Sequence, residues 1–307
     1  MELLVRRLRE AGFPARSVRR VTGGVVATAG LATLADGSQV FAKTLEGKGA
    51  GTGTGTGTGD GDGETGGGDV FEIEAEGLRA LRELGGVATP EVLAVRPGLL
   101  VLQPLAPRPD GDARFWERLG HSIATLHATT ATGRFGWHQD GWLGRVRQHN
   151  AWDTDGHAFY ARHRILRWLP EPLVEAAFGK EDRQAVERLC AALPDLIPDM
   201  PPVLTHGDLW RENVLSRPGG HPVLVDPAVS YTWAEVDVSM LWCSTRPPAS
   251  NRFFEAYAEV LPLRDGWRER APLLNLRELL STIAHDDDHW GAAQAVRTII
   301  APFARKR

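Results

Sequence analysis

The feature that most constrains this chain is the run HGDLWRENV at residues 206–214, followed by the apolar run PVLV that ends at Asp226. Transfer of a phosphoryl group from a nucleotide needs a proton acceptor, and it needs magnesium held by hard oxygen ligands. Asp208 can serve as the acceptor, and Asn213 can turn back onto a metal ion. Residues 222–225 predict a buried strand, so the carboxylate of Asp226 is expected to emerge at a strand end and face the same cleft.

The order of these three residues is that of a kinase catalytic loop: an Asp, four residues, an Asn, and then a strand that ends in a metal-binding Asp. An Asp-Leu pair near an Asn is common in proteins without this activity. The second Asp at a strand end, together with the features upstream, favours a kinase-like fold.

Composition excludes several other classes. A chain of 307 residues fits one large domain or two lobes. The net charge of −4 gives no basic surface for nucleic acid, and no apolar stretch approaches the ~20 residues of a membrane span. The charged N-terminus lacks the apolar core of a signal peptide. Cys190 and Cys243 are too few and too far apart for a disulfide framework, so we expect buried thiols in a cytoplasmic protein.

Residues 1–103 predict a small, β-rich lobe that covers a nucleotide. Apolar runs at 18–21, 25–34 and 40–45, separated by glycine-containing turns, predict three antiparallel strands, and two further strands are expected at 92–95 and 99–102. The turn containing Gly23 and Gly24 is a candidate cover for the nucleotide. Lys43 lies inside an apolar run, where a lysine is costly unless it meets an anion, and we favour a phosphate-facing Lys43 over an edge-strand lysine that points to water.

Three further segments complete this lobe. Residues 47–68 are so rich in glycine that they predict a disordered insert, and they do not match a phosphate-binding P-loop. Residues 70–84 have helical periodicity, end at Gly85-Gly86, and offer Glu72, Glu74 and Glu76 as partners for Lys43. Gln103 and Leu105 are expected in the connection between lobes, where backbone groups are available to an adenine edge.

Residues 104–307 predict a large, mostly helical lobe for catalysis and substrate binding. Helices are expected from Asp112 to Ala131, at 158–170, 171–178 and 181–193, and over most of the chain after residue 234. A small β-rich lobe, a short connector and a large helical lobe, in that order, predict an α+β bilobal fold of the protein-kinase type with the nucleotide bound between the lobes.

Several stretches of the chain resemble the fructosamine kinase family, a branch of the aminoglycoside phosphotransferase-like kinases. They are HGDLWRENV, the run PVLVDPAVSYTWAEVDVSM, the helix FEIEAEGLRAL, and LGHSIATLHATTATGRFGWHQDGWLG. The resemblance extends from about residue 22 to 302, interrupted by the glycine-rich insert. Its most specific parts are the Asp-Leu-Trp of the catalytic loop and Asp226-Pro227-Ala228, where protein kinases have Asp-Phe-Gly.

The resemblance implies roles for individual residues. It makes Asp208 the catalytic base, Asn213 and Asp226 the magnesium ligands, Lys43 the phosphate-binding lysine and Glu74 the partner of Lys43. It also implies that two further residues are structural: Asp237 braces the catalytic loop by accepting hydrogen bonds, and His206 orients that loop. Family members use ATP and magnesium to phosphorylate ketosamines, chiefly at the 3-hydroxyl of the sugar, so free or protein-linked ketosamines are the expected partners. A monomer or weak dimer is expected.

The chain departs from the family pattern in two places. Arg211-Glu212 replaces a small pair beside the metal site and is expected to face solvent, although it could alter what the site accepts. After Asp-Pro-Ala, the run SYTWAE keeps Glu235 but lacks the family's basic residues. These departures concern the identity of the substrate and leave the reaction type unchanged.

The substrate side of the site is predicted less sharply. The aromatic candidates for contact with a sugar are Trp210, Tyr231, Trp233 and Trp290, although any single tryptophan is more often a core residue. The run His285 to His289 holds Asp286, Asp287 and Asp288. Consecutive helical side chains diverge by about 100° and do not converge on one ion, which disfavours a metal site. We favour a solvated acidic helix turn. The second interpretation is an acidic wall that attracts a cationic amine, with Asp288 as the candidate contact.

Two other functions stay open at the level of sequence. One is phosphorylation of an aminoglycoside or another aminated natural product, which Trp210 and the Asp-Pro-Ala sequence disfavour. The other is a binding protein without catalysis on a kinase scaffold. The presence of all five residues of the predicted machinery (Lys43, Glu74, Asp208, Asn213 and Asp226) disfavours that function.

Overall fold

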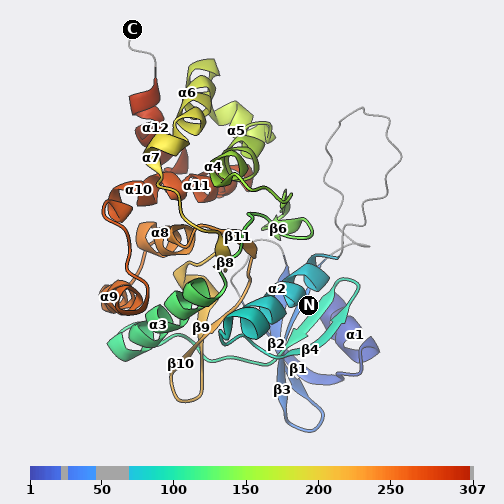
Figure 1. Ribbon diagram of the computed structural model, residues 1–307. Coiled ribbons are helices and arrows are strands. Elements are labelled where there is room, and N and C mark those ends of the chain that lie inside the picture. The colour runs from blue at the N-terminus through green and yellow to red at the C-terminus, as the bar shows by residue number, and fades with distance from the viewer. Residues whose placement is uncertain (22–26, 46–68, 305–307) are drawn as a thin grey trace.

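The computed structural model describes residues 1–21, 27–45 and 69–304, which form the predicted small β-rich lobe and large helical lobe (Figure 1). The expectations for Gly23, Gly24 and the insert at 47–68 lie outside the described residues. Among the described residues, no helix has the length and apolar character needed to cross a membrane.

The small lobe is a five-stranded antiparallel sheet with one helix on each face. The strands lie in the order β1-β2-β3-β5-β4 and span Ala15–Val21 (β1), Thr28–Leu34 (β2), Gln39–Thr44 (β3), Val92–Arg96 (β4) and Leu99–Leu102 (β5). The helices are α1 (Glu2–Glu10) and α2 (Val70–Gly85). Leu4 and Leu8 of α1 pack on one face of the sheet, and Phe71 and Leu78 of α2 pack on the other.

The alternation of side chains along β3 directs Lys43 toward α2. Val40, Ala42 and Thr44 are buried on one face, so Phe41 and Lys43 lie on the opposite one. The helix that meets them has well-formed ends, because the Asp69 side chain accepts a hydrogen bond from the backbone N–H of Phe71, and Gly86 ends α2 in the left-handed conformation.

The large lobe is built mainly of helices, most of them short. They are α3 (Ala113–Thr129), α4 (Gly156–Tyr160), α5 (Pro172–Ala177), α6 (Lys180–Ala191), α7 (Leu193–Leu196), α8 (Glu235–Cys243), α9 (Asn251–Val260), α10 (Trp267–Leu274), α11 (Leu276–Ala284) and α12 (Ala292–Ile300). A π-helical segment at Ala161–Ile165 continues α4, and single 3₁₀ turns lie at Leu166–Trp168, Arg211–Asn213, Pro248–Ser250 and Ala301–Phe303.

Three two-stranded ribbons complete the large lobe. They are β6 (Gly141–Leu143) with β7 (Val146–Gln148), β8 (Val203–Thr205) with β11 (Ser230–Thr232), and β9 (Val214–Arg217) with β10 (His221–Leu224). Both the catalytic loop and the Asp226 segment connect these ribbons, so each is fixed at its two ends by strand pairing.

Two hydrophobic cores support this arrangement. One is centred on α3, α8 and α9 and includes Trp116, Phe253 and Tyr257. The other joins α4, α6, α11 and α12 and includes Trp168 and Trp233. The catalytic segments lie between these cores and the small lobe (Figure 1).

Two expectations on local structure are wrong. The acidic run was expected to be a helix turn, but α11 ends at Ala284 and Asp286 has a φ of 59°, which breaks the helical path. Cys190 is a buried free thiol as expected, whereas Cys243, near the end of α8, is a free thiol exposed to solvent. Amphipathic periodicity indicates which positions can be buried, but it does not say where a helix stops.

Candidate active site

The catalytic loop leaves β8 at Thr205 and returns to β9 at Val214. Within it, the Asn213 side chain turns back onto Asp208, as the spacing predicts. Asn213 Nδ2 donates hydrogen bonds to the backbone oxygen of Asp208 at 2.8 Å and to Asp208 Oδ2 at 2.7 Å. Because the amide nitrogen faces Asp208, the amide oxygen Oδ1 of Asn213 is the atom left for a cation.

The loop needs a glycine before its catalytic aspartate. Gly207 has a φ of +78°, and a Cβ at this position would lie 2.1 Å from the carbonyl oxygen of Ala228. The Asp-Pro-Ala segment therefore passes against the backbone of the catalytic loop, and Ala228 N donates to the carbonyl oxygen of His206 at 2.9 Å.

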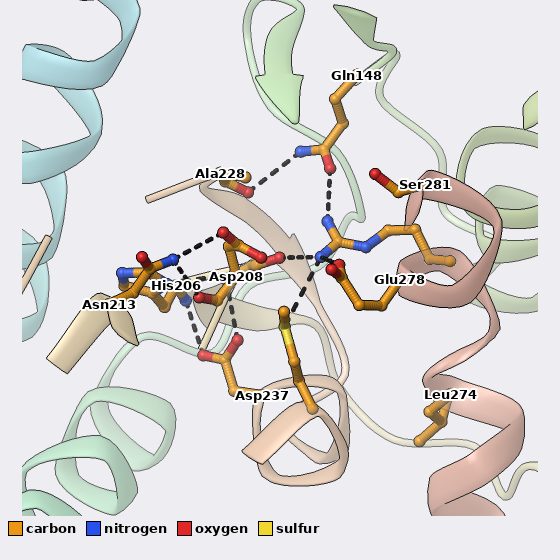
Figure 2. A network of polar contacts seen from close by, with 12 residues as sticks. Gln148, His206, Asp208, Asn213, Ala228, Asp237, Leu274, Glu278 and Ser281 are labelled. Carbon is orange, nitrogen blue, oxygen red and sulfur yellow. Dashed lines mark hydrogen bonds and ion pairs between the residues drawn. The ribbon is translucent and has the colours of Figure 1, made fainter. Parts of the chain in front are cut away.

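Asp237, on α8 and fully buried, braces this loop. Its two carboxylate oxygens accept the backbone N–H groups of His206 at 2.7 Å and Gly207 at 2.9 Å (Figure 2). The His127 ring nitrogen Nε2 lies 3.2 Å from the same carboxylate. Burial alone would raise the pKa of Asp237, but these hydrogen bonds and the nearby histidines hold it below its usual value.

His206 orients the loop through its side chain. Nε2 donates to the carbonyl oxygen of Val225 at 3.0 Å, and Nδ1 accepts the backbone N–H of Asp208 at 3.2 Å. This assignment requires the neutral ring with its proton on Nε2. Burial favours that form because it lowers the pKa of His206.

The Asp208 carboxylate lies where its negative charge is poorly stabilised. Burial raises the pKa of Asp208 well above its usual value, and the nearby negative charge of Glu278 adds to the effect. Arg277 and the hydrogen bond from Asn213 oppose it. A carboxylate that is poorly solvated in this way is a better proton acceptor than one in water.

Lys43 joins the two lobes through a pair of carboxylates. Its Nζ lies 2.9 Å from Glu74 Oε1 on α2 and also contacts Asp226 Oδ1 in the large lobe. Burial by itself lowers the pKa of Lys43, but the two carboxylates outweigh it and hold the pKa above its usual value. Lys43 lowers the pKa of Asp226, against the effect of burial, so this pair stays charged.

Helix α2 is also fastened to the large lobe beyond Glu74. Glu76 accepts hydrogen bonds from Trp137 Nε1 at 3.0 Å and Gln139 Nε2 at 2.5 Å. Gly77 lets the helix pack against the Asp-Pro-Ala segment, because a Cβ there would lie 3.0 Å from Pro227 Cγ. Glu74 is thereby fixed opposite Lys43.

These groups face one cleft of about 710 Å³ between the lobes. Its polar lining includes all five residues of the predicted machinery: Lys43, Glu74, Asp208, Asn213 and Asp226. Its apolar lining includes Leu31, Phe41, Leu102 and Leu215, and both Gln103 and Leu105 reach it from the connector. The cleft is thus lined by both apolar and charged side chains.

Of the predicted substrate contacts, the structure brings only Trp210 to this cleft, where its side chain is well exposed. Tyr231 lies on β11, and its ring packs against Trp137 and Trp152. Trp233 is 1% exposed inside a core, and Glu235 forms a salt bridge with Arg270 at 2.6 Å. Their closeness in sequence to Asp226 was misleading, because the chain turns inward at α8.

Asp288 is not brought to the cleft either. Its carboxylate accepts the backbone N–H groups of Gly291, Ala292 and Ala293 at the start of α12. It caps that helix. Burial raises the pKa of Asp288, but the three backbone hydrogen bonds together outweigh this effect and hold the pKa below its usual value.

Sequence reasoning missed three residues that support the site. Arg108, from the connector, donates to the backbone oxygens of Arg211 and Val214 and so holds this end of the catalytic loop. Glu212, expected to face solvent, lines the cleft. Arg277 and Glu278 approach the catalytic loop from α11 (Figure 2). These residues are far from the catalytic loop in the sequence, so no local sequence pattern connected them with it. An arginine inside the apolar pattern of α11 was the one available hint.

The chain is similar to known proteins over most of its length. The profile of the fructosamine kinase family matches residues 64–301. The chain belongs to the fructosamine kinase family. This membership confirms the bilobal protein-kinase-like fold and identifies the protein as a phosphotransferase.

Individual relatives agree with the assignment. A protein of Klebsiella aerogenes named as a probable ketoamine kinase is 35% identical over 232 residues, which cover 73% of this chain and 78% of the relative. Protein-ribulosamine 3-kinase of rice (Oryza sativa subsp. japonica) is 28% identical over 227 residues, covering 70% of this chain and 64% of that protein. A crystal structure from Thermobifida fusca, provisionally named fructosamine-3-kinase, is 31% identical with a TM-score of 0.78, covering 99% of this chain and 98% of its own.

Proposed function

We propose that this kinase transfers a phosphoryl group from ATP, with magnesium, to a sugar hydroxyl of a ketosamine. The observation that supports this most strongly is the convergence on one cleft of Asp208 and Asn213 from the catalytic loop, Asp226 from the adjoining segment and Lys43 from the small lobe. A base, a cation site and a phosphate-binding lysine are the parts that phosphoryl transfer requires.

In this proposal the nucleotide lies with its base in the apolar end of the cleft. Phe41, Leu102 and Leu215 offer flat apolar surface, and the backbone of Gln103 to Leu105 offers hydrogen-bonding groups at the lobe connection. The triphosphate would then extend toward Lys43, whose positive charge is held in place by Glu74.

The donor set suits magnesium. The described residues contain no group of three or more His, Cys, Asp or Glu side chains placed to hold a metal. Asn213 Oδ1 and the Asp226 carboxylate offer two hard oxygen ligands, which fits an ion that completes its shell with phosphate oxygens and water. When bound there, magnesium neutralises charge on the phosphate oxygens.

The chain's own residues carry out the remaining chemistry. Asp208 orients the attacking hydroxyl and accepts its proton at a carboxylate oxygen. Asn213 holds that carboxylate in place, and Asp237 and His206 hold the loop that carries both. Lys43 positions the phosphate for attack, so most of the rate enhancement comes from positioning and charge.

The ketosamine class is supported by the relatives, one of which is named for ribulosamine. Trp210 offers an apolar face for the sugar at the open side of Asp208. We place the enzyme in the cytoplasm as a monomer or weak dimer, with free or protein-linked ketosamines as partners and no nucleic acid. The free thiols of Cys190 and Cys243 suit a reducing compartment.

An ATP-consumption assay over fructosamines, ribulosamines and aminoglycosides, each with and without magnesium, tests this function. Turnover that requires magnesium and prefers the ketosamines is expected. Turnover of aminoglycosides alone would move the enzyme to a different substrate class. Absence of turnover together with nucleotide binding would indicate a binding protein.

A further inference from the structure

Glu278 on α11 presents a carboxylate oxygen that the protein does not satisfy. Its Oε2 is buried and makes no hydrogen bond to any part of the chain that the structure describes. The nearest cation is Arg277, whose Nη2 lies 3.8 Å away, beyond hydrogen-bonding distance. Arg277 Nη2 instead donates to the carbonyl oxygen of Gly207, the residue before Asp208.

A carboxylate oxygen in this position is costly. A buried acceptor without a donor loses its hydration and receives nothing in return. Burial raises the pKa of Glu278, and the positive charge of Arg277 offsets this only in part. The other carboxylate oxygen, Oε1, is not buried and also has no hydrogen-bond partner among the described residues. The side chain is 32% exposed, so a donor from outside the protein can reach the carboxylate at Oε1.

The position of Glu278 indicates which donor fits. The side chain reaches from α11 toward the catalytic loop (Figure 2), and its charge raises the pKa of Asp208. Other cations near the base are already engaged: Lys43 with Glu74 and Asp226, and Arg277 with Gly207 and Gln148. The Glu278 carboxylate therefore has no cation within hydrogen-bonding distance, and it lies beside Asp208, which receives the substrate hydroxyl in the proposed reaction.

In a ketosamine, the amine nitrogen lies only a few bonds from the 3-hydroxyl. We infer that the Glu278 carboxylate binds the protonated amine of the substrate while Asp208 receives the hydroxyl, so that Glu278 selects cationic ketosamines. This inference rests on the proposed function and gives that site a specificity residue. An ammonium that donates to the accessible oxygen Oε1 also supplies the positive charge that complements the whole carboxylate, including the buried Oε2.

The acidic run 286–288 is less suited to this task. Asp288 is occupied as the cap of α12, and Asp287 lies 3.2 Å from His289 on an exposed connection. The charge of an exposed carboxylate is screened by water and salt, so it contributes little to binding. Asp287 therefore supplies a matched control for Glu278.

The test is a binding titration without ATP, using an N-alkyl fructosamine, whose amine is protonated, and its N-acetylated analogue, which is neutral. Glu278→Gln removes the charge and keeps the shape of the side chain. We expect the Kd for the cationic ligand to rise roughly tenfold or more, and the Kd for the neutral ligand to change far less. Asp287→Asn is expected to change neither Kd, and circular dichroism checks that both variants are folded.

Two results would overturn the inference on Glu278, and a third would separate it from the proposed function. Equal changes in Kd for the two ligands in Glu278→Gln would remove Glu278 from amine recognition. The same conclusion follows if the Kd for the cationic ligand stays at the wild-type value. If wild-type enzyme binds the cationic ligand through Glu278 but consumes no ATP with it, the proposed reaction fails and the inference on Glu278 stands.

Discussion

The carboxylate of Asp237 holds the backbone of His206, with Oδ2 2.7 Å from the amide nitrogen of that residue. Its other oxygen takes the neighbouring N–H of Gly207. A side chain from α8 thus satisfies two backbone donors that no strand or helix partner could reach, immediately before the catalytic aspartate. The geometry of the active site depends on this one buried carboxylate.

Asp237→Asn is expected to lower the free energy of unfolding by about 1–3 kcal/mol at neutral pH, because an amide offers one acceptor oxygen where the loop uses two. Urea unfolding followed by tryptophan fluorescence measures this. Asp199→Asn, at a fully exposed aspartate, is the control. Identical unfolding curves for Asp237→Asn and wild type would contradict the bracing role.

The penalty of Asp237→Asn should also depend on pH. The folded-state pKa of Asp237 lies below its unfolded value, so its contribution is complete above the unfolded pKa of about 3.9 and is lost as pH falls through the folded pKa. The unfolding free energies of mutant and wild type should therefore converge as pH falls below about 4. A difference that grows toward acid would reverse the assigned direction of the pKa shift.

Asp208→Asn should lower kcat by at least ~10², with the affinity for ATP nearly unchanged, because the variant loses the proton acceptor and keeps the shape of the loop. Steady-state kinetics and nucleotide titration separate the two effects. Asp199→Asn serves again as the control and should match wild type. Turnover of the Asp208 variant near the wild-type rate would exclude this residue as the base.

Lys43→Met should raise the KM for ATP and lower kcat, and Glu74→Gln should do the same more weakly, since Lys43 retains Asp226 as a partner. The two residues are in direct contact, so their effects should not add. A double-mutant cycle on kcat/KM is expected to give a coupling of roughly 0.5–3 kcal/mol. Strict additivity would show that Glu74 does not act through Lys43.

Two tryptophans offer a paired prediction. Trp210 lies exposed in the cleft, whereas Trp233 is enclosed in a core. Trp210→Ala should raise the KM for ketosamine several-fold and leave stability unchanged, because no core is disturbed. Trp233→Ala should destabilise the fold by roughly 3–5 kcal/mol. Thermal unfolding and substrate kinetics on both variants check this, and an exchange of the two outcomes would refute the placement of the substrate.

The sequence predicted those parts of the site that depend on short spacing. Asn213 returns to Asp208 within a single loop, and Asp226 lies two residues after β10 ends at Leu224, so local pattern was sufficient for both. Lys43 was identified from the cost of a lysine in an apolar strand. Periodicity could not choose among Glu72, Glu74 and Glu76, because all three lie within about one turn of the same helix, and only the family resemblance favoured Glu74.

The parts that the sequence could not predict depend on tertiary contacts. Arg277 meets Gly207 from 70 residues away, and Arg108 meets Arg211 from 103 residues away. Trp233 and Glu235 follow Asp226 in sequence, but packing of α8 takes them into the interior. For Asp288 a local signal existed, since an aspartate shortly before a glycine and a helix often caps that helix.

The attachment of α2 to the large lobe has a consequence for regulation. Glu76 is hydrogen-bonded to Trp137 and Gln139, and Gly77 packs against Pro227, so the helix that carries Glu74 cannot swing outward without breaking contacts across the cleft. In kinases switched by phosphorylation, movement of the corresponding helix disconnects this glutamate from its lysine. Here the Lys43–Glu74 contact is already present in the folded chain without any modification, and the contacts of α2 with the large lobe hold it in that state.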